Sequence, residues 1–416
     1  MVKNNPFFSK SFTDVWLSHF GHKHKTLEFE SIYPVKFLRN RFRLYYYNVG
    51  KNITNGVSYV LSNNQNDCKG KVFLIYDVLP YLRERHNLTG DHPYLKLKKA
   101  PQYKGYLTDL SGFKNFDDFF LRHFSAKSRG NIRKWDKRLK LNFKVDFKVF
   151  YGEIELEVYN HVFDNLLILI QKRWDDLGME NDILKDHDYY HELCYNMILD
   201  KTATLNVLYA NDEIVAISIC FASNKELFFA ITSFDIDFRK YNLGHLLIMY
   251  IMNWCFETGF DIFDYSKGTY EYKTRWSNKT YVFEDHILFD RNSIGSNLVG
   301  NYLVLFYRMK QFLRERNVNL LYSRIKYWIH TMKFKTKKDP KILIKDLDIV
   351  DDVITKSKQV DKDSDDYAKL KPIICDIIFT ATQPFNTVKA YKVNDEKNKF
   401  ILAGDDFIKE VVFESR

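Results

Sequence analysis

The stretch from Leu205 to Phe234 constrains the fold of this chain more than any other part of its sequence. Asn206–Ala210 and Ile214–Phe221 are apolar and rich in β-branched residues, and the polar residues between them are typical of a hairpin turn. Leu227–Phe234 is a third apolar run of strand length. We therefore predict neighbouring β-strands here, at the centre of a sheet.

A glycine-containing loop and a helix follow the third strand. Arg239-Lys240-Tyr241-Asn242-Leu243-Gly244 opens a helical pattern that stops at Gly259, and Asp261–Tyr265 has the pattern of another strand. Where a strand leads through such a loop into a helix, backbone N–H groups and the positive end of the helix dipole can face an anion. The order of elements predicts an α/β fold that binds a phosphate-bearing ligand.

The loop resembles a known phosphate-binding loop. Arg-x-x-Asn-x-Gly, from Arg239 to Gly244, is similar to the acyl-coenzyme A pyrophosphate loop of the GCN5-related N-acetyltransferases (GNATs), which usually has Gln/Arg-x-x-Gly-x-Gly/Ala. Asn242 replaces the first glycine; asparagine tolerates a left-handed backbone, but its side chain can crowd a pyrophosphate. The resemblance implies acyl-coenzyme A, acetyl-coenzyme A above all, as co-substrate, and an aminoacyl donor stays open.

Further motifs resemble one branch of this superfamily, the acetyltransferases of cellulose and exopolysaccharide biosynthesis, which are related to the Fem peptidyltransferases. The branch shows a basic helix, a helix that ends in Arg-Trp, an Asp-containing strand and Gly-x-x-x-Tyr-Lys-x-x-Trp. This chain has them in that order, within residues 105–290: Ser128–Lys134, Lys172-Arg173-Trp174, Phe263-Asp264-Tyr265 and Gly268–Trp276.

The resemblance and the sequence pattern together predict the domain organisation. We expect a GNAT-like mixed sheet flanked by helices, in two lobes, with helical and small β additions at the C-terminal end. The expected parts are an N-terminal α/β lobe at 1–110, the acyltransferase domain at 111–292, a basic amphipathic helical region at 293–340, a charged linker at 341–369 and a β-rich appendage at 370–416, with a strand over Ile373–Thr380.

The helical region at 296–338 allows two interpretations. Its apolar residues recur at helical spacing, and one face is expected to hold Tyr302, Leu303, Phe306, Met309, Phe312 and Leu313. A helix of this kind packs on the body of the protein, which we favour, or lies on a membrane surface with aromatic anchors and a basic face. In the second case the protein contacts the inner face of the membrane peripherally.

Composition excludes several classes of protein. The five cysteines form no Cys-x-x-Cys pair, which argues against a disulfide scaffold or a zinc site and suits a reducing cytoplasm. His187 and His191 have helical spacing, but the Glu of a His-Glu-x-x-His motif is absent, so we predict no metal. No apolar run is long enough to span a membrane, and no signal peptide is recognised at the start.

Charge is unevenly distributed along the chain. The net charge is +10, and ten Lys and Arg residues lie between Arg122 and Lys148 against two aspartates. Such a stripe attracts polyanions or a phosphorylated ligand. Because no nucleic-acid reading module accompanies it, we do not expect nucleic acid as a partner, except for tRNA if the chain is an aminoacyl transferase.

Transfer of an acyl group from a thioester to an amine requires a bound donor, a base and a stabilised oxyanion. Asp264 is the predicted base, because it ends an apolar strand where a cleft should open; the alternative is a structural carboxylate paired with Lys267, Lys273 or Arg275. Glu271 is the second candidate for the base, and Tyr270 or Tyr272 could protonate the thiolate. The resemblance implies substrate contacts at Tyr272, Lys273 and Trp276.

The donor is expected on the loop, at Arg239, Tyr241, Asn242, Leu243, Gly244 and His245, with its pyrophosphate on the backbone amides from Tyr241 to His245. Asp235 and Asp237 precede the loop as Asp-x-Asp. This pair could hold a metal-bound nucleotide, but we favour a role in shaping the turn.

These observations predict an acyltransferase that moves an acyl group from acyl-coenzyme A to an amine. The acceptor is expected to be a small molecule or a saccharide, such as an amino sugar in polysaccharide or envelope assembly. A Fem-like transferase that uses aminoacyl-tRNA is one alternative. A non-catalytic protein that binds polyanions or membrane surfaces with a degenerate acyltransferase fold is another.

Overall fold

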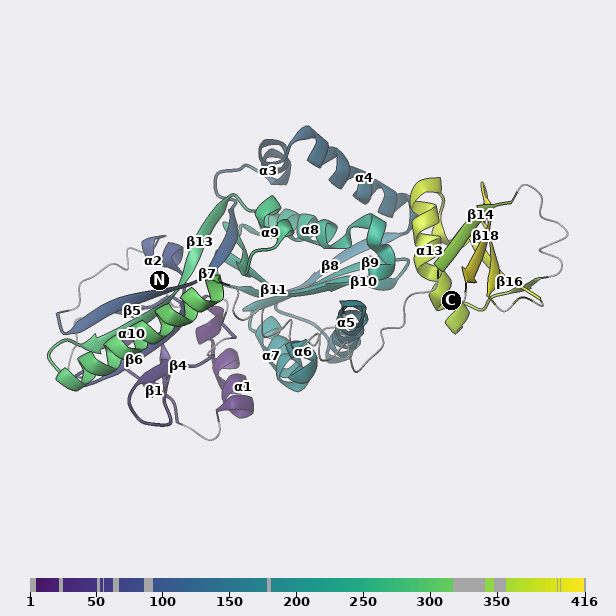
Figure 1. Cartoon of the computed structure of the whole chain (residues 1–416). Coiled ribbons are helices and arrows are strands. Elements are labelled where there is room, and N and C mark those ends of the chain that lie inside the picture. Colours follow the sequence, from purple (N-terminus) through teal and green to yellow (C-terminus); the bar gives the residue numbers. More distant parts are fainter. Residues whose placement is uncertain are drawn as a thin grey trace.

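The computed structural model describes residues 5–21, 25–50, 53–54, 56–62, 67–85, 93–177, 181–316, 341–347, 357–394, 396 and 398–414 (Figure 1). Most of the strands belong to a single eleven-stranded sheet, whose order is β1-β3-β4-β6-β13-β7-β12-β11-β10-β9-β8. A five-stranded sheet lies near the C-terminal end, and β2 and β5 form a separate pair.

The N-terminal part supplies one end of the large sheet. Its elements are η2 (Pro6–Phe8), α1 (Lys10–Phe20), β1 (Leu27–Glu28), β2 (Ile32–Tyr33), β3 (Lys36–Arg39), β4 (Tyr46–Asn48), β5 (Val60–Leu61), β6 (Val72–Val78), α2 (Pro80–Arg85) and β7 (Leu95–Asp109). β6 is buried along its whole length, which explains its apolar run from Val72 to Ile75.

The middle of the chain supplies the other end of the sheet and the helices that cover it. Its elements are α3 (Phe116–His123), α4 (Ala126–Asn142), β8 (Val145–Phe150), α5 (Leu156–Leu177), α6 (Asp182–Lys185), α7 (His187–Leu199), β9 (Ala203–Ala210), β10 (Glu213–Ala222), β11 (Glu226–Phe234), η3 (Ile236–Tyr241), α8 (Leu243–Thr258), β12 (Ile262–Lys267), α9 (Glu271–Trp276), β13 (Lys279–Asp290) and α10 (Ile294–Glu315). The predicted hairpin is β9 and β10, which pair antiparallel.

Two long strands join the two ends of the sheet. β7 has fifteen residues and pairs with β12 near its end, while β13 pairs with β7 on one side and with β6 on the other. The two expected lobes therefore share one continuous hydrogen-bonded sheet.

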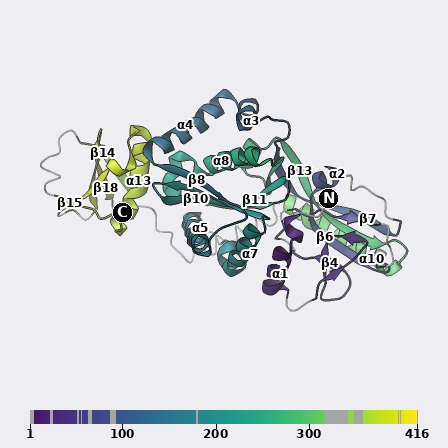
Figure 2. The same cartoon turned by 180° about the vertical axis from the view of Figure 1, so that it is seen from behind.

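Helices cover the middle part of the sheet on both faces. α3, α4, α8 and α9 lie on one face, and α5, α6 and α7 lie on the other, as the two opposite views show (Figures 1 and 2). Each face has its own hydrophobic core: Leu246, Ile251 and Trp276 belong to the first, and Phe163, Leu193 and Ile217 to the second. Burial on both faces accounts for the nearly continuous apolar runs of β9, β10 and β11.

α10 packs on the sheet, but not through the face that the sequence pattern predicted. Its buried residues include Gly300, Leu303, Val304 and Tyr307, and a Cβ on Gly300 would lie 2.4 Å from the Phe289 ring. The small residue lets the helix approach β13 closely. The other predicted residues of that face are exposed: Tyr302, Phe306, Met309, Phe312 and Leu313. Residues 317–340 lie outside the described part.

The C-terminal part differs from the expected linker and appendage. It contains β14 (Lys341–Asp346), β15 (Ser357–Gln359), α13 (Asp365–Ala381), η4 (Phe385–Thr387), β16 (Lys389–Val393), β17 (Lys399–Ala403) and β18 (Ile408–Glu414). β14 and β15 lie in the range expected to be a linker and are the two edge strands of the five-stranded sheet.

The predicted strand over Ile373–Thr380 is wrong, because these residues belong to α13. A β-branched run favours a strand, but Ile373, Ile374, Ile377 and Ile378 also share one face of a helix, and that face is buried. Ser364 caps the helix and aspartates occupy its first turn. Within the described residues, no helix is both long and apolar enough to cross a membrane.

Candidate acyl-transfer site

The sheet opens between β11 and β12. These parallel strands pair at three positions only, the last of which joins Phe228 to Asp264. Beyond this point β11 continues to Phe234 with β10 as its partner, while β12 continues to Lys267 beside β7. The two strands therefore diverge, and the backbone edge of β11 that faces β12 is released from strand pairing at the point where Asp264 lies.

The predicted anion-binding loop follows directly from the free end of β11. η3 ends at Tyr241, and Asn242, whose backbone has φ 51° and ψ 50°, separates it from α8, which starts at Leu243. The left-handed conformation expected for Asn242 is thus present, which explains how asparagine can replace glycine here. In the first turn of α8, the N–H of His245 donates to the carbonyl of Asn242 at 2.9 Å, whereas the N–H groups of Leu243 and Gly244 have no acceptor among the described residues. This end of the helix therefore suits an anion.

Gly244 is the second residue of α8 and lies against the end of β11. A Cβ on this residue would be 3.0 Å from Cε1 of Phe234. The guanidinium of Arg173, from α5, lies 4.5 Å from the centre of the same Phe234 ring. Burial lowers the pKa of Arg173, and the tyrosines Tyr272 and Tyr270 oppose this effect. A cation, an aromatic ring and a helix start therefore meet beside the divergent strands.

The side chains of the loop have partners within the protein. Arg239 forms an ion pair of 2.9 Å with Asp176, and Tyr241 is fully buried, with its hydroxyl donating to the carbonyl of Cys375 in α13 at 3.4 Å. Of the predicted donor-binding residues, Arg239 and Tyr241 thus fix the loop through their side chains. Any contact of Tyr241 with a donor would involve its backbone.

His245 links the loop to α9. The indole N–H of Trp276 donates to Nδ1 of His245 at 2.8 Å, and the ring of Trp135 stacks on the imidazole at 5.5 Å. Burial, with a smaller effect of the Arg275 charge, lowers the pKa of His245 to about 4, so the ring is neutral at pH 7. The resemblance implies a substrate contact at Trp276. Its side chain is fully buried in this structure, where it positions His245.

Asp264 is fully buried at the point where the strands part. Its carboxylate accepts hydrogen bonds from the hydroxyls of Tyr81 (2.7 Å) and Tyr281 (2.6 Å) and from the backbone N–H of Ser266 (2.6 Å). Burial raises its pKa to about 6, against the opposing effect of these donors. The ion pairs considered in the sequence analysis are not formed, because Lys267 pairs with Asp77 and the Lys273 ammonium donates to the carbonyl of Lys267.

The residues of the Gly-x-x-x-Tyr-Lys-x-x-Trp segment have different exposures. Tyr270 and Glu271 are exposed, whereas Tyr272 is partly buried and burial raises its pKa to about 12. Lys273 is almost completely buried, and burial lowers its pKa to about 8, although the negative charge of Asp264 opposes the change. Tyr270 and Glu271 are therefore open to a substrate, while Lys273 lies below the surface.

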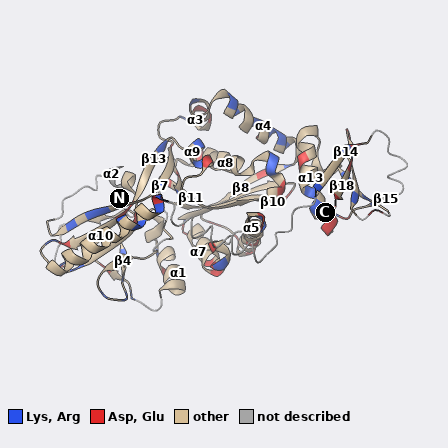
Figure 3. Cartoon of the chain, viewed as in Figure 1, with Lys and Arg blue, Asp and Glu red and all other residues tan. Residues whose placement is uncertain are grey.

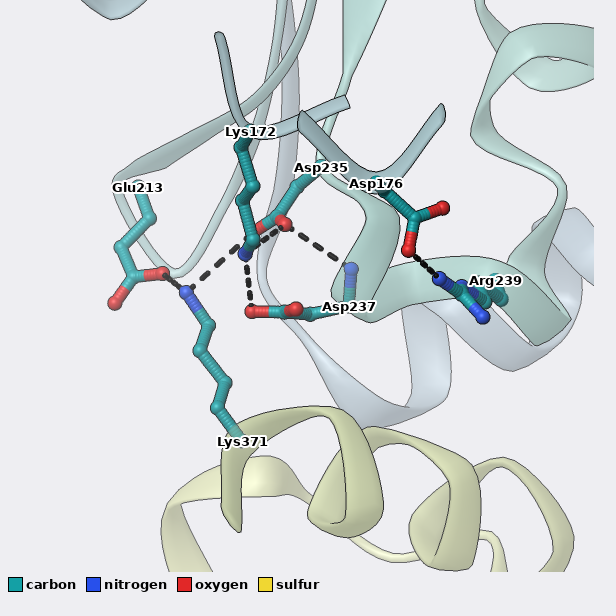
Figure 4. A network of polar contacts seen from close by, with 7 residues as sticks. All are labelled: Lys172, Asp176, Glu213, Asp235, Asp237, Arg239 and Lys371. Carbon is teal, nitrogen blue, oxygen red and sulfur yellow. Dashed lines mark hydrogen bonds and ion pairs between the residues drawn. The ribbon is translucent and has the colours of Figure 1, made fainter. Parts of the chain in front are cut away.

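The Asp-x-Asp pair, Asp235 and Asp237, stabilises the chain just before the loop. Lys172 donates to Asp235 at 2.7 Å and to Asp237 at 2.6 Å, and Lys371 of α13 lies between Asp235 and Glu213 (Figure 4). Asp235 also caps η3 by accepting from the N–H of Asp237. Both carboxylates are occupied by lysines, as expected for residues that shape the turn.

A metal site is not formed in the described part of the chain: no group of three or more His, Cys, Asp or Glu residues there could hold an ion. His187 lies beside Asp188, and His191 interacts with the amide oxygen of Asn160.

Sequence reasoning missed two residues of this site. Tyr81 and Tyr281 hold Asp264, but they come from α2 and β13, at 183 and 17 residues from Asp264 in the sequence. No local motif marks them, because their meeting depends on the pairing of β13 with β7 and β6.

The central part of the chain is similar to a known protein family. Residues 126–274 match the family model described as "Acetyltransferase (GNAT) domain". No curated protein matches this sequence.

Solved structures are similar to this chain at low sequence identity. FemX has 11% identity and a TM-score of 0.46, covering 70% of this chain and 93% of its own. A conserved protein of unknown function from Bacteroides thetaiotaomicron has 10% identity and a TM-score of 0.43, covering 69% and 92%. The C-terminal domain of a putative lysylphosphatidylglycerol synthetase from Agrobacterium fabrum has 12% identity and a TM-score of 0.41, covering 68% and 89%.

None of these names mentions cellulose or exopolysaccharide, so that part of the resemblance stays a prediction. The GNAT match covers the divergent strands, the loop and the start of α8. Residues 126–274 are therefore similar to the acetyltransferase domain of the GNAT superfamily.

Proposed function

We propose that this protein transfers an acyl group from acyl-coenzyme A to an amine. The observation that carries the proposal is the divergence of β11 and β12 after Phe228 and Asp264, within the GNAT domain and next to the start of α8. The gap between the strands exposes backbone groups of β11, and the helix start offers amides to a phosphate. Both features suit a long thioester that carries a pyrophosphate.

The thioester would lie along the free edge of β11. A backbone N–H on that edge can donate to the carbonyl oxygen of the thioester as negative charge develops on it. The pyrophosphate would contact the loop from Tyr241 to His245 through the N–H groups of Leu243 and Gly244, because those of Asn242 and His245 already donate to backbone carbonyls. The neutral His245 and the ion-paired Arg239 hold this loop in place before the donor arrives.

The protons would move through the tyrosines that hold Asp264. The attacking amine loses a proton to the hydroxyl oxygen of Tyr81, whose own proton passes to the carboxylate at 2.7 Å. The C–S bond breaks as the amide forms, and the leaving thiolate takes a proton from Tyr270, which is exposed near the site. Asp264 suits this role because burial keeps its pKa, about 6, close to neutral pH.

The acceptor is proposed to be a small-molecule or saccharide amine, as in the polysaccharide-related branch that the motifs resemble. Acetyl-coenzyme A is the proposed donor. Glu271 is the alternative base, since it is exposed at the start of α9 and needs no relay.

Calorimetric titration with acetyl-coenzyme A tests the donor. Gly244→Glu places a carboxylate at the start of α8, where it would repel the pyrophosphate and push against Phe234. Gly295→Glu is a matched control, because Gly295 is also the second residue of a helix and a Cβ there meets no atom within 4 Å. We expect micromolar binding by the wild type and by Gly295→Glu, and a loss of at least tenfold in Gly244→Glu.

Absence of binding to acetyl-coenzyme A and to longer acyl-coenzyme A would contradict the proposal. A Fem-like transferase that uses aminoacyl-tRNA would then be favoured, because Lys127, Arg133, Lys134, Lys137 and Lys140 form an exposed basic stripe on α4 (Figure 3). Salt-sensitive binding of tRNA would support that second candidate.

The exposed face of α10 supports the third candidate, a membrane-surface protein. Leu298, Tyr302, Leu305 and Phe306 are exposed along this helix, with Arg308 and Lys310 nearby in the sequence. Sedimentation with anionic vesicles, without any acyl transfer, would favour it.

A further inference from the structure

A polar cavity of about 380 Å³ lies in the N-terminal half of the sheet, outside the residues that match the GNAT domain except for one lysine. Its walls come from β6, β7, β13 and α10, and Lys267 at the end of β12 reaches it from the transfer site. None of the residues that line the cavity has a role in the proposed chemistry.

Two carboxylates form the inner wall. Asp285 is 4% exposed, and the one hydrogen bond that its carboxylate accepts from another described residue comes from the N–H of Asp77 at 3.3 Å. Asp77 itself is satisfied by the hydroxyl of Thr54 (2.8 Å) and the ammonium of Lys267 (2.6 Å). Asp285 thus has an oxygen left to accept from a ligand, and burial together with Asp77 raises its pKa to about 7.

Two cations lie at the side formed by α10. Lys310 and Arg314 are one helical turn apart, and within the described residues neither forms an ion pair. Arg314 stacks 3.8 Å from the centre of the Tyr103 ring and donates to the side-chain oxygen of Gln102, which fixes the guanidinium in place. A fixed guanidinium beside an unpaired ammonium is suited to a phosphate or carboxylate.

The cavity lies close to the transfer site, with a short row of packed side chains between them. The Lys267 ammonium lies 5.4 Å from the Phe283 ring, which contacts the Tyr281 ring at 5.1 Å, and Tyr281 donates to Asp264. Tyr281 and Asp285 are four residues apart on β13, which corresponds to about 13 Å along a strand. One extended molecule could reach both places.

We propose that this cavity binds the acidic sugar end of the acceptor, with hydroxyl groups on Asp285 and a phosphate or carboxylate on Lys310 and Arg314. The amine that receives the acyl group lies at the other end of the same molecule, near Asp264. The acceptor is thus a saccharide longer than one sugar ring. This inference rests on the proposed function only for the position of the amine, and the binding of the sugar can be tested by itself.

The probe is glucose 6-phosphate, titrated into the full chain and followed by calorimetry, with glucose and inorganic phosphate as separate probes. We expect millimolar binding of glucose 6-phosphate and at least tenfold weaker binding of either fragment. Asp285→Asn should weaken binding about fivefold and Lys310→Met about tenfold. Arg308→Met is the matched control, because it removes one charge from α10 at a residue that does not line the cavity and should change binding less than twofold.

Three results would overturn the inference: no binding of glucose 6-phosphate at 50 mM, equal binding of inorganic phosphate, or unchanged binding in both cavity variants. Lys310→Met keeps the test valid if Asp285→Asn fails to fold, because Lys310 is exposed. Failure here with intact acetyl-coenzyme A binding would leave the proposed function standing. Sugar binding without acetyl-coenzyme A binding would keep the cavity as a saccharide site and refute the transferase.

Discussion

Asp264 combines complete burial with two tyrosine donors, and this arrangement determines how it can act. A carboxylate that a substrate cannot touch can still take up a proton through Tyr81. Asp264→Asn should lower kcat/KM by about 10²- to 10³-fold, because proton removal from the amine is lost. Asp261→Asn, at the partly exposed start of the same segment, should stay within twofold.

The pH dependence of kcat/KM should follow the ionisation of Asp264. The active form of Asp264 is ionised, so kcat/KM of the wild type should rise as the pH increases through about 6. Asp264→Asn should lose this inflection. An unchanged inflection in the variant would assign the base to another residue, with Glu271 as the next candidate.

His245 should make stability depend on pH. Its pKa is about 4 in the folded protein and near 6.5 in the unfolded chain, so between these values the unfolded state binds more protons. Stability is therefore gained as the pH rises from 4 to 6.5, by about 2 kcal/mol. His245→Gln should flatten this slope in urea unfolding measured at pH 5 and pH 7, whereas His187→Gln, at an exposed position, should keep it.

At the scale of elements, local sequence patterns were sufficient to predict the structure where residues that are neighbours in the sequence are also neighbours in space. The hairpin of β9 and β10, the left-handed Asn242 and the stop of α8 at Gly259 were predicted because turns and helix ends depend on a few adjacent residues. The isoleucines of α13 were misassigned, since β-branched residues favour strands unless tertiary packing overrides them. The face of α10 that packs on the sheet was mispredicted for a related reason. It is the face that carries Gly300, whose lack of a side chain lets the helix approach Phe289, and apolar spacing alone does not indicate this.

Docking of α13 on η3 should contribute to stability. Lys371 interacts with Glu213 at 2.8 Å and with Asp235 at 3.6 Å, and it is mostly buried (Figure 4). Lys371→Met would leave Asp235 with Lys172 as its remaining charged partner and should cost about 2 kcal/mol in urea unfolding. Lys369→Met, on the exposed side of the same helix, should cost less than 0.5 kcal/mol, roughly the value of a surface ion pair.

At the scale of the whole molecule, the two halves of the large sheet are not independent. β13 pairs with both β6 and β7, and β12 also requires β7 as a neighbour. A fragment of residues 111–292, the range expected for the acyltransferase domain, lacks β6 and β7. We expect it to show no cooperative unfolding transition, whereas the full chain shows one through both halves. Cooperative unfolding of the fragment in urea would contradict this expectation.

The same strand order affects synthesis of the chain on the ribosome. Val72 of β6 pairs with Phe289 of β13, which is translated on the order of tens of seconds later. Until then β6, which is buried along its whole length in the folded protein, lacks the neighbour on that edge of the sheet. We expect the nascent chain to present this strand to cellular chaperones during that interval, so that the yield of folded protein depends on the speed of translation.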